Sequence, residues 1–156
     1  MTDAFPSLAE LAAEEEELQF TGFTNDDAWE LGSALVAAAR NEAAPVAIDI
    51  TRNRHRLFHA ALPGATPDND TWIERKTRVV NRFGHSSLYV RQASRERGRT
   101  FEEEFGLDPL RYAAHGGAFP LLVRSVGPVG VVVVSGLPQL ADHRMVVAAL
   151  RARLRR

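Results

Sequence analysis

The fold is decided by residues 119–135, which read FPLLVRSVGPVGVVVVS. Two apolar runs rich in β-branched residues, 119–126 and 129–135, flank Gly127-Pro128, a pair that is typical of a turn. Strands that are apolar at successive positions belong to sheets whose two faces are both covered. We therefore predict that this segment forms a hairpin at the core of a sheet.

The segments that flank this hairpin carry the residues best suited to a binding site. His115-Gly116-Gly117 precedes it, and Ser135-Gly136-Leu137 follows it and leads to a helix start with Asp142-His143. Glycines allow close approach of the backbone, free amides at a helix start attract anions, and imidazole binds metals or titrates near neutral pH. The sequence thus indicates a site for a small molecule or an anion beside the hairpin.

No set of residues elsewhere in the sequence completes a reaction. His55, His59 and His85 lack the spacing of a metal site, and the serines have no activating base at the level of sequence. We therefore expect no metal site, and the sequence leaves both the catalytic residues and the cofactor unknown.

The rest of the chain predicts helices on both sides of such a sheet. Capping signals at Ser7 and Thr24 begin two helices, and the acidic run 14–17 is expected to end the first one early because negative charge is unfavourable at a helix C-terminus. The other expected elements are a strand over 18–23, a hairpin over 46–62, helices over 71–83, 86–97 and 100–105, and a last helix from Pro138. This order predicts a three-layer α/β/α domain with an antiparallel sheet.

Composition limits the choice of partners. The 156 residues include 19 Lys and Arg, 20 Asp and Glu, and no cysteine. This balance gives no electrostatic support for binding nucleic acid or an anionic membrane, and it excludes disulfides and thiolate metal sites. Because residues 1–10 do not resemble a signal peptide, we expect a cytoplasmic protein with one domain over 1–156, of which 1–17 is an N-terminal helical extension.

Lys76 is the only lysine of the chain. Where arginine is otherwise the rule, a lone ammonium marks either a position that requires a compact point charge or an ordinary surface lysine. On the same predicted helix, Arg75, Arg78 and Arg82 form a basic stripe, which is either a solvated face or a surface toward an anion or a subunit.

Four blocks of sequence carry a resemblance to a known family. They are PVAIDI at 45–50, DNDTWIERK at 68–76, YAAHGGAFP at 112–120, and VSGLPQ at 134–139 with Asp142-His143. On these blocks the chain resembles uncharacterised protein family 0303, a branch of the haem-degrading-domain superfamily that also contains HbpS-like, GlcG-like and PduO C-terminal-like proteins. The resemblance extends over nearly the whole chain from Leu18.

This resemblance implies a profilin-like, five-stranded antiparallel sheet with helices on both faces. It also implies homo-oligomers, often large rings or octamer-like assemblies, and it makes haem or another tetrapyrrole a candidate ligand. For this branch it implies no established reaction, so whether the protein is an enzyme stays open.

Each candidate ligand-binding residue has a structural alternative. His115 either ligates iron or cobalt or is a hydrogen-bonded structural residue. Gly116-Gly117 either admits a ligand or forms a bend, and the amides of Gly136 and Leu137 either hold a carboxylate or are capped by the protein itself. We predict the ligand-binding residues to be His115, Gly116, Gly117, Phe119, Gly136, Leu137, His143, Arg75 and Lys76.

Two main hypotheses of function follow. The first is a small-molecule-binding domain for haem, another tetrapyrrole or a small organic anion. The second is a homo-oligomeric protein-interaction module in which the same segments only shape the fold. A haem-degrading enzyme is a third hypothesis with less support, because axial coordination alone does not supply a mechanism.

Overall fold

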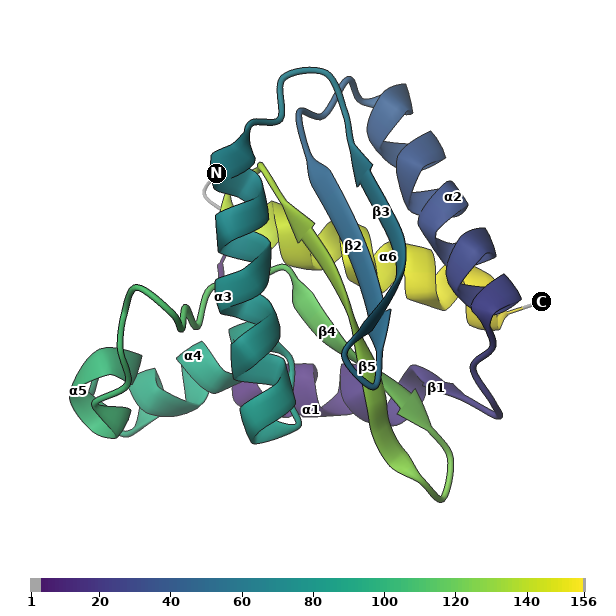
Figure 1. Ribbon diagram of the computed structural model, residues 1–156. Helices are drawn as coiled ribbons and strands as arrows, with labels where there is room; N and C mark the ends of the chain where they lie inside the picture. The colour runs from purple at the N-terminus through teal and green to yellow at the C-terminus, as the bar shows by residue number, and fades with distance from the viewer. Residues whose placement is uncertain (1–3, 156) are drawn as a thin grey trace.

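β4 (Ala118–Val123) and β5 (Gly127–Ser135) form the predicted hairpin at the centre of the fold. The structure is a computed structural model that describes residues 4–155 (Figure 1). β5 pairs with β4 on one side and with another hairpin on the other side, so it is the middle strand of the sheet.

The turn of this hairpin lies earlier than the sequence predicts. It occupies 124–126, where Ser125 adopts a left-handed φ of 65° and the N–H of Val126 donates to the carbonyl of Val123 over 3.0 Å. The prediction that Gly127-Pro128 forms the turn was wrong, because both residues already belong to β5.

The sheet has five strands in the order β1-β4-β5-β2-β3. β2 (Ala47–Arg52) and β3 (His55–Ala61) confirm the predicted hairpin over 46–62. β1 (Gln19–Phe20) is shorter than predicted and pairs with β4 in parallel, so the sheet is not entirely antiparallel. No hairpin joins β1 to β4 in this chain, and local turn geometry therefore does not fix the direction of β1.

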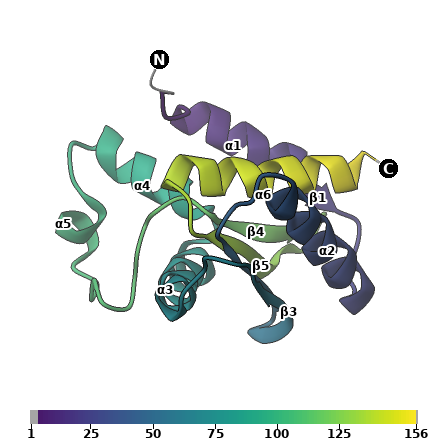
Figure 2. The same cartoon turned by 90° about the horizontal axis from the view of Figure 1, so that it is seen from above.

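Helices cover both faces of the sheet, which confirms the three-layer fold (Figure 2). One face packs against α3 (Pro67–Phe83), beside which lie α4 (Ser87–Glu96) and α5 (Phe101–Phe105). The other face packs against α2 (Asn25–Asn41) and α6 (Gln139–Leu154). Among the described residues, no helix is long and apolar enough to cross a membrane.

The apolar side chains of β5 contribute to two hydrophobic cores, one on each face of the sheet. Val132 and Val134 belong to the core under α2 and α6, whereas Val131 and Val133 belong to the core under α3. Since successive side chains of a strand point to opposite faces, both faces of this strand must be apolar.

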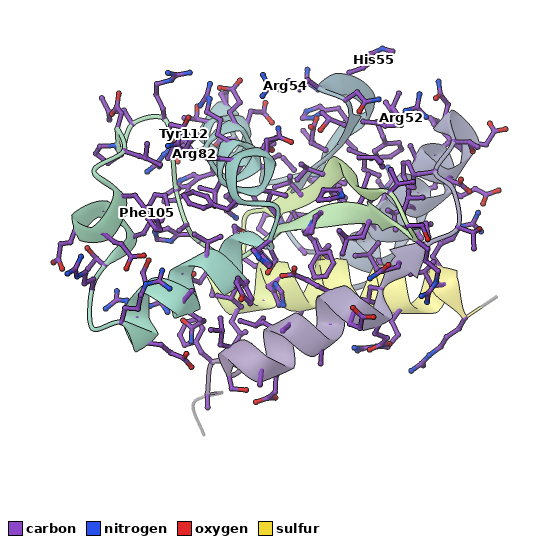
Figure 3. All side chains as sticks on the ribbon, turned by 90° about the horizontal axis from the view of Figure 1, so that it is seen from below. Arg52, Arg54, His55, Arg82, Phe105 and Tyr112 are labelled. Atoms are coloured by element: carbon purple, nitrogen blue, oxygen red, sulfur yellow. The ribbon has the colours of Figure 1, made fainter. Side chains whose placement is uncertain are left out.

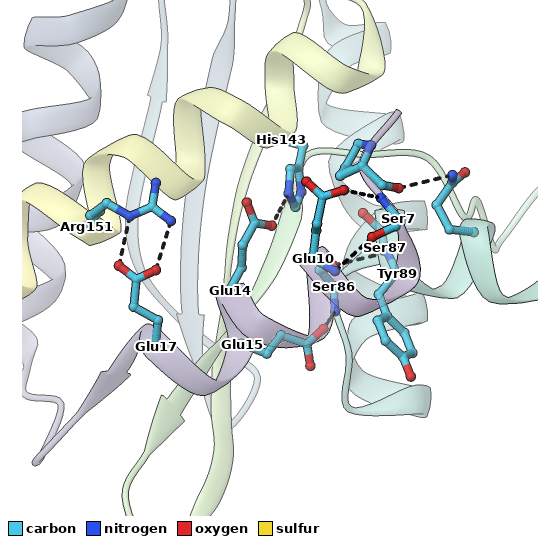
Figure 4. A network of polar contacts seen from close by, with 12 residues as sticks. Ser7, Glu10, Glu14, Glu15, Glu17, Ser86, Ser87, Tyr89, His143 and Arg151 are labelled. Atoms are coloured by element: carbon cyan, nitrogen blue, oxygen red, sulfur yellow. Dashed lines mark hydrogen bonds and ion pairs between the residues drawn. The ribbon is translucent and has the colours of Figure 1, made fainter. Parts of the chain in front are cut away.

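α1 (Leu8–Glu17) contains the whole acidic run, so the prediction that this helix ends early was wrong. Two glutamates of this run bind basic residues of α6 (Figure 4). Glu14 lies 2.8 Å from Nε2 of His143, and Glu17 accepts two hydrogen bonds from Arg151 at 2.8 and 3.0 Å. These contacts offset the unfavourable interaction with the helix dipole and hold α1 against the rest of the fold.

Candidate ligand pocket

A pocket of about 280 Å³ lies where the segments on both sides of the central hairpin meet α3. Three side chains come from successive turns of one face of α3, one from the loop before β4, and the others from the end of β5 and the start of α6. The lining residues are Asn69, Trp72, Lys76, His115, Ser135, Gly136, Leu137, Gln139 and Asp142. Most of these side chains are polar, so the pocket suits a molecule with hydrogen-bonding groups.

A buried ion pair forms part of the pocket wall. The Lys76 ammonium lies 3.2 Å from an oxygen of Asp142 and donates to the carbonyl of Val134, also over 3.2 Å. The two residues are only 3% and 1% exposed. A charged pair at this depth requires close partners, because the loss of hydration costs several kcal/mol for each ion.

Burial acts on both members of this pair. It lowers the pKa of Lys76, while the charge of Asp142 opposes the change. It raises the pKa of Asp142, while Lys76 and two backbone amides oppose the change. Both shifts bring the ion pair closer in free energy to the neutral pair, in which the proton resides on the carboxyl group.

The backbone amides before α6 already have a carboxylate partner. The N–H of Leu137 donates to Asp142 over 2.9 Å, and the N–H of Gly136 donates to it over 3.4 Å. Of the two alternatives for these amides, the structure therefore shows capping by the protein itself. A carboxylate ligand would have to displace Asp142 to use them.

Close packing requires the two glycines that follow His115, although neither of them lines the pocket. A Cβ on Gly117, whose φ is +130°, would lie 2.4 Å from the carbonyl oxygen of Val134 and 2.7 Å from Nζ of Lys76. A Cβ on Gly116 would lie 2.4 Å from the carbonyl oxygen of Gln139, whose side chain accepts a hydrogen bond from the Gly116 N–H over 3.0 Å. These contacts bring the loop against α6 and the end of β5, with no room for a further side chain between them.

His115 is half-buried at the pocket wall. Its ring packs edge-to-face against Trp72, with the ring centroids 5.1 Å apart. Burial, and then the positive charge of Lys76, lower the pKa of His115, so the imidazole is uncharged at neutral pH. Within residues 4–155 this ring has no hydrogen-bond partner, which leaves its nitrogens available to a ligand.

Two arginines of the predicted basic stripe bind the loop between α5 and β4. Arg75 donates to the carbonyl of Pro109 over 2.7 Å and lies over the ring of Trp72, 4.3 Å from its centroid. Arg78 donates to the carbonyl of Arg111 over 3.0 Å. The predicted ligand residue Arg75 therefore supports the wall of the pocket from behind and does not line it.

Besides Arg75, Gly116 and Gly117, two other predicted ligand residues do not line the pocket. Phe119 is fully buried in the core under α2 and α6. His143 is also buried, and it faces α1, where it contacts Glu14 (Figure 4). Of the predicted ligand residues, His115, Lys76, Gly136 and Leu137 line the pocket.

Several residues that line the pocket were not predicted from the sequence. Asn69 and Trp72 share one face of α3 with Lys76, because their spacing of three and four residues matches the helix period. That spacing was visible in the sequence. The pairing of Asp142 with Lys76 was not, since 66 residues separate them. No group of three or more His, Asp or Glu side chains suited to a metal ion occurs in the described part of the chain.

A second, larger groove of about 790 Å³ lies between α2 and α6. Its floor consists mainly of alanines, and its rim carries both acidic and basic side chains. The floor includes Ala34, Ala38, Ala141, Ala148, Ala149 and Ala152, and the rim includes Glu30, Glu42, Arg144 and Arg153.

Comparisons with known sequences agree with the predicted resemblance. The model of the family described as haem degrading protein HbpS-like matches residues 23–151. A UPF0303 protein of Streptomyces coelicolor is 61% identical over 145 residues, which cover 93% of this chain and 92% of the relative. A UPF0303 protein of Psychromonas ingrahamii is 46% identical over 144 residues, which cover 92% of this chain and 91% of the relative.

Solved structures share the fold. The crystal structure of the Ybr137w protein matches with a TM-score of 0.84 at 40% identity, over 93% of this chain and 86% of the other. The structure titled PduOC:Heme Complex matches with a TM-score of 0.64 at 18% identity, over 84% of this chain and 94% of the other. At that identity the second likeness shows the fold alone.

Breaking the buried pair should destabilise the protein in a pH-dependent way. Lys76→Met leaves a buried carboxylate without its partner, and we expect the free energy of unfolding at neutral pH to fall by roughly 3–5 kcal/mol. Without Lys76, burial raises the pKa of Asp142 further, so the folded state favours the protonated carboxyl. The loss relative to wild type should therefore shrink at low pH and grow as the pH rises through this raised pKa.

Denaturant unfolding at several pH values measures this effect. The double variant Lys76→Met/Asp142→Asn removes both charges, keeps an oxygen for the Leu137 and Gly136 amides, and should recover much of the loss at neutral pH. A deficit for Lys76→Met that is small and independent of pH would contradict the burial of a charged pair.

Proposed function

Because the chain belongs to the family of HbpS-like haem-degrading proteins, we propose that it binds a small molecule in the pocket between α3 and α6. The observation that carries this proposal is the position of the Lys76–Asp142 pair. A buried ion pair contributes little net stability compared with apolar side chains of the same size. Its place at the wall of a polar pocket fits a role in recognising a ligand.

The preferred ligand is small, polar and uncharged. Lys76 and Asp142 balance each other, and His115 is uncharged at neutral pH, so the pocket offers no net charge to an anion. The amides that a carboxylate would use are bound to Asp142. The volume of about 280 Å³ lies just below the range of roughly 300–1,000 Å³ that drug-sized ligands occupy.

Haem is a second candidate ligand, and His115 is the residue that suits it. A neutral imidazole at a pocket wall is able to ligate haem iron, and a structural neighbour is titled a haem complex. The pocket of about 280 Å³ is smaller than the macrocycle, so most of a haem bound by His115 would lie outside it. Axial coordination by His115 alone would supply no mechanism for haem degradation.

The two tryptophans allow a direct test of ligand binding in the pocket. Trp72 lines the pocket, whereas Trp29 is 66% exposed on α2. We expect hydroxyacetone, a small uncharged probe, to shift the indole N–H signal of Trp72 in NMR spectra and to leave that of Trp29 unchanged. Trp72→Phe assigns the signals, and acetate is the anionic comparison. Equal responses of the two indoles, or none, would contradict a specific pocket.

A haemin titration tests the second candidate. If His115 is the axial ligand, His115→Ala should weaken haemin binding by at least about tenfold, or 1.4 kcal/mol. His55→Ala is the matched control, because His55 is an exposed imidazole at the end of the β2–β3 turn (Figure 3). Affinity should also fall as the pH drops below the lowered pKa of His115, since imidazolium cannot ligate iron. Equal Soret titrations of both variants would exclude His115 as the ligand.

Self-association is a second candidate function, favoured by the groove between α2 and α6. α6 is apolar both toward the sheet and toward this groove, and a helix that is apolar on several sides is normally covered. We propose that a second copy of the chain covers it. In a two-fold pair each copy presents the same surface, so a rim with both charges can match itself.

Light scattering after size-exclusion chromatography tests this interface. Ala148→Arg places a charge on the floor of the groove and should convert the assembly to monomers. Ala37→Arg is the matched control, since Ala37 is exposed on α2 outside the groove. A monomeric wild type, or an intact assembly in Ala148→Arg, would contradict the proposal.

A further inference from the structure

We infer that Lys76 is a nucleophile that forms an imine with the carbonyl group of a small aldehyde or ketone bound in the pocket. This inference rests on the proposed function, because it names the class of ligand that the pocket takes. A lysine in a desolvated pocket beside an acid–base group is the arrangement that such chemistry requires.

Among the described residues, one N–H donor of the Lys76 ammonium has no hydrogen-bond partner. An ammonium group has three N–H donors, and the hydrogen bonds of Lys76 engage two of them, one with Asp142 and one with the carbonyl of Val134. The backbone of Gly117 closes one side of Nζ, because a Cβ there would lie 2.7 Å from Nζ and 2.4 Å from the carbonyl oxygen of Val134. The Lys76 side chain is only 4% exposed but lines the pocket, so a ligand reaches Nζ from the pocket itself.

Asp142 provides the proton transfers that the reaction needs. The ammonium of Lys76 first passes a proton to the carboxylate, 3.2 Å away, and becomes a free amine. Burial favours this transfer, since it disfavours charge on both groups.

The bonds and protons then balance without another reactant. The amine nitrogen attacks the carbonyl carbon, the C=O π bond breaks, and the oxygen takes up the amine proton to give a carbinolamine. Asp142 returns its proton to this hydroxyl group, which leaves as water while the C=N bond forms. The product is a protonated imine on Lys76, and it pairs with the Asp142 carboxylate as the ammonium did before.

The other walls of the pocket restrict the carbonyl compound. Trp72 and His115 form an aromatic side, and Asn69 and Gln139 present amide groups that can bond a hydroxyl. A volume of about 280 Å³ admits only a short carbon chain. We therefore expect a small hydroxylated aldehyde or ketone.

Reductive trapping tests the inference on the wild-type protein. Hydroxyacetone and sodium cyanoborohydride convert an imine to a stable secondary amine, which intact mass and peptide mapping detect. Because Lys76 is the only lysine, the amino terminus is the only other primary amine and serves as the internal reference. We expect Lys76 to be labelled at least about tenfold faster than the amino terminus in native protein, and to lose this advantage in guanidinium chloride.

Two variants separate the chemistry from simple exposure. Lys76→Arg should remove the label, and Asp142→Asn should slow labelling by roughly 10²-fold or more, as expected for loss of a general acid–base group. Labelling of Lys76 in native protein at or below the rate of the amino terminus would overturn the inference. If hydroxyacetone shifts the Trp72 signal but is not trapped, the imine is wrong and the binding pocket stands. If neither occurs, both proposals fail.

Discussion

The buried contact between Lys76 and Asp142 is the interaction on which the pocket depends. It links α3 to the first turn of α6, and through the carbonyl of Val134 it reaches the end of β5. Asp142 also holds the loop that joins β5 to α6 through its contact with the Leu137 amide. Two charged side chains thus connect the helix on one face of the sheet with a helix on the other.

Local patterns predicted most of the fold. The hairpin at 119–135, the hairpin at 46–62 and the long helix α3 follow from periodicity and capping, which act within a few residues. The full length of α1 did not follow, because its partners His143 and Arg151 lie 129 and 134 residues away from the glutamates that bind them. Contacts at such separation leave no periodic signal.

The candidate site was predictable to a similar extent. His115 and Lys76 were predicted as ligand residues from their residue types, and both line the same pocket in the structure. Arg75 is the neighbour of Lys76 in sequence, but it points to the loop behind the pocket wall because adjacent helical residues face different directions. Phe119 likewise points into the core under α2 and α6. A residue that belongs to one of the quoted sequence blocks therefore does not necessarily line the pocket.

The chemical state of Lys76 tests this account most directly, and the presence of a single lysine makes it measurable. Protein labelled with ¹⁵N-lysine should give one side-chain NMR signal. We predict that the pKa of Lys76 lies below the usual value for a lysine, about 10.4, and that hydroxyacetone changes the Nζ signal. A signal that titrates like that of an exposed lysine and does not change with hydroxyacetone would contradict the claim that this buried pair forms a ligand site.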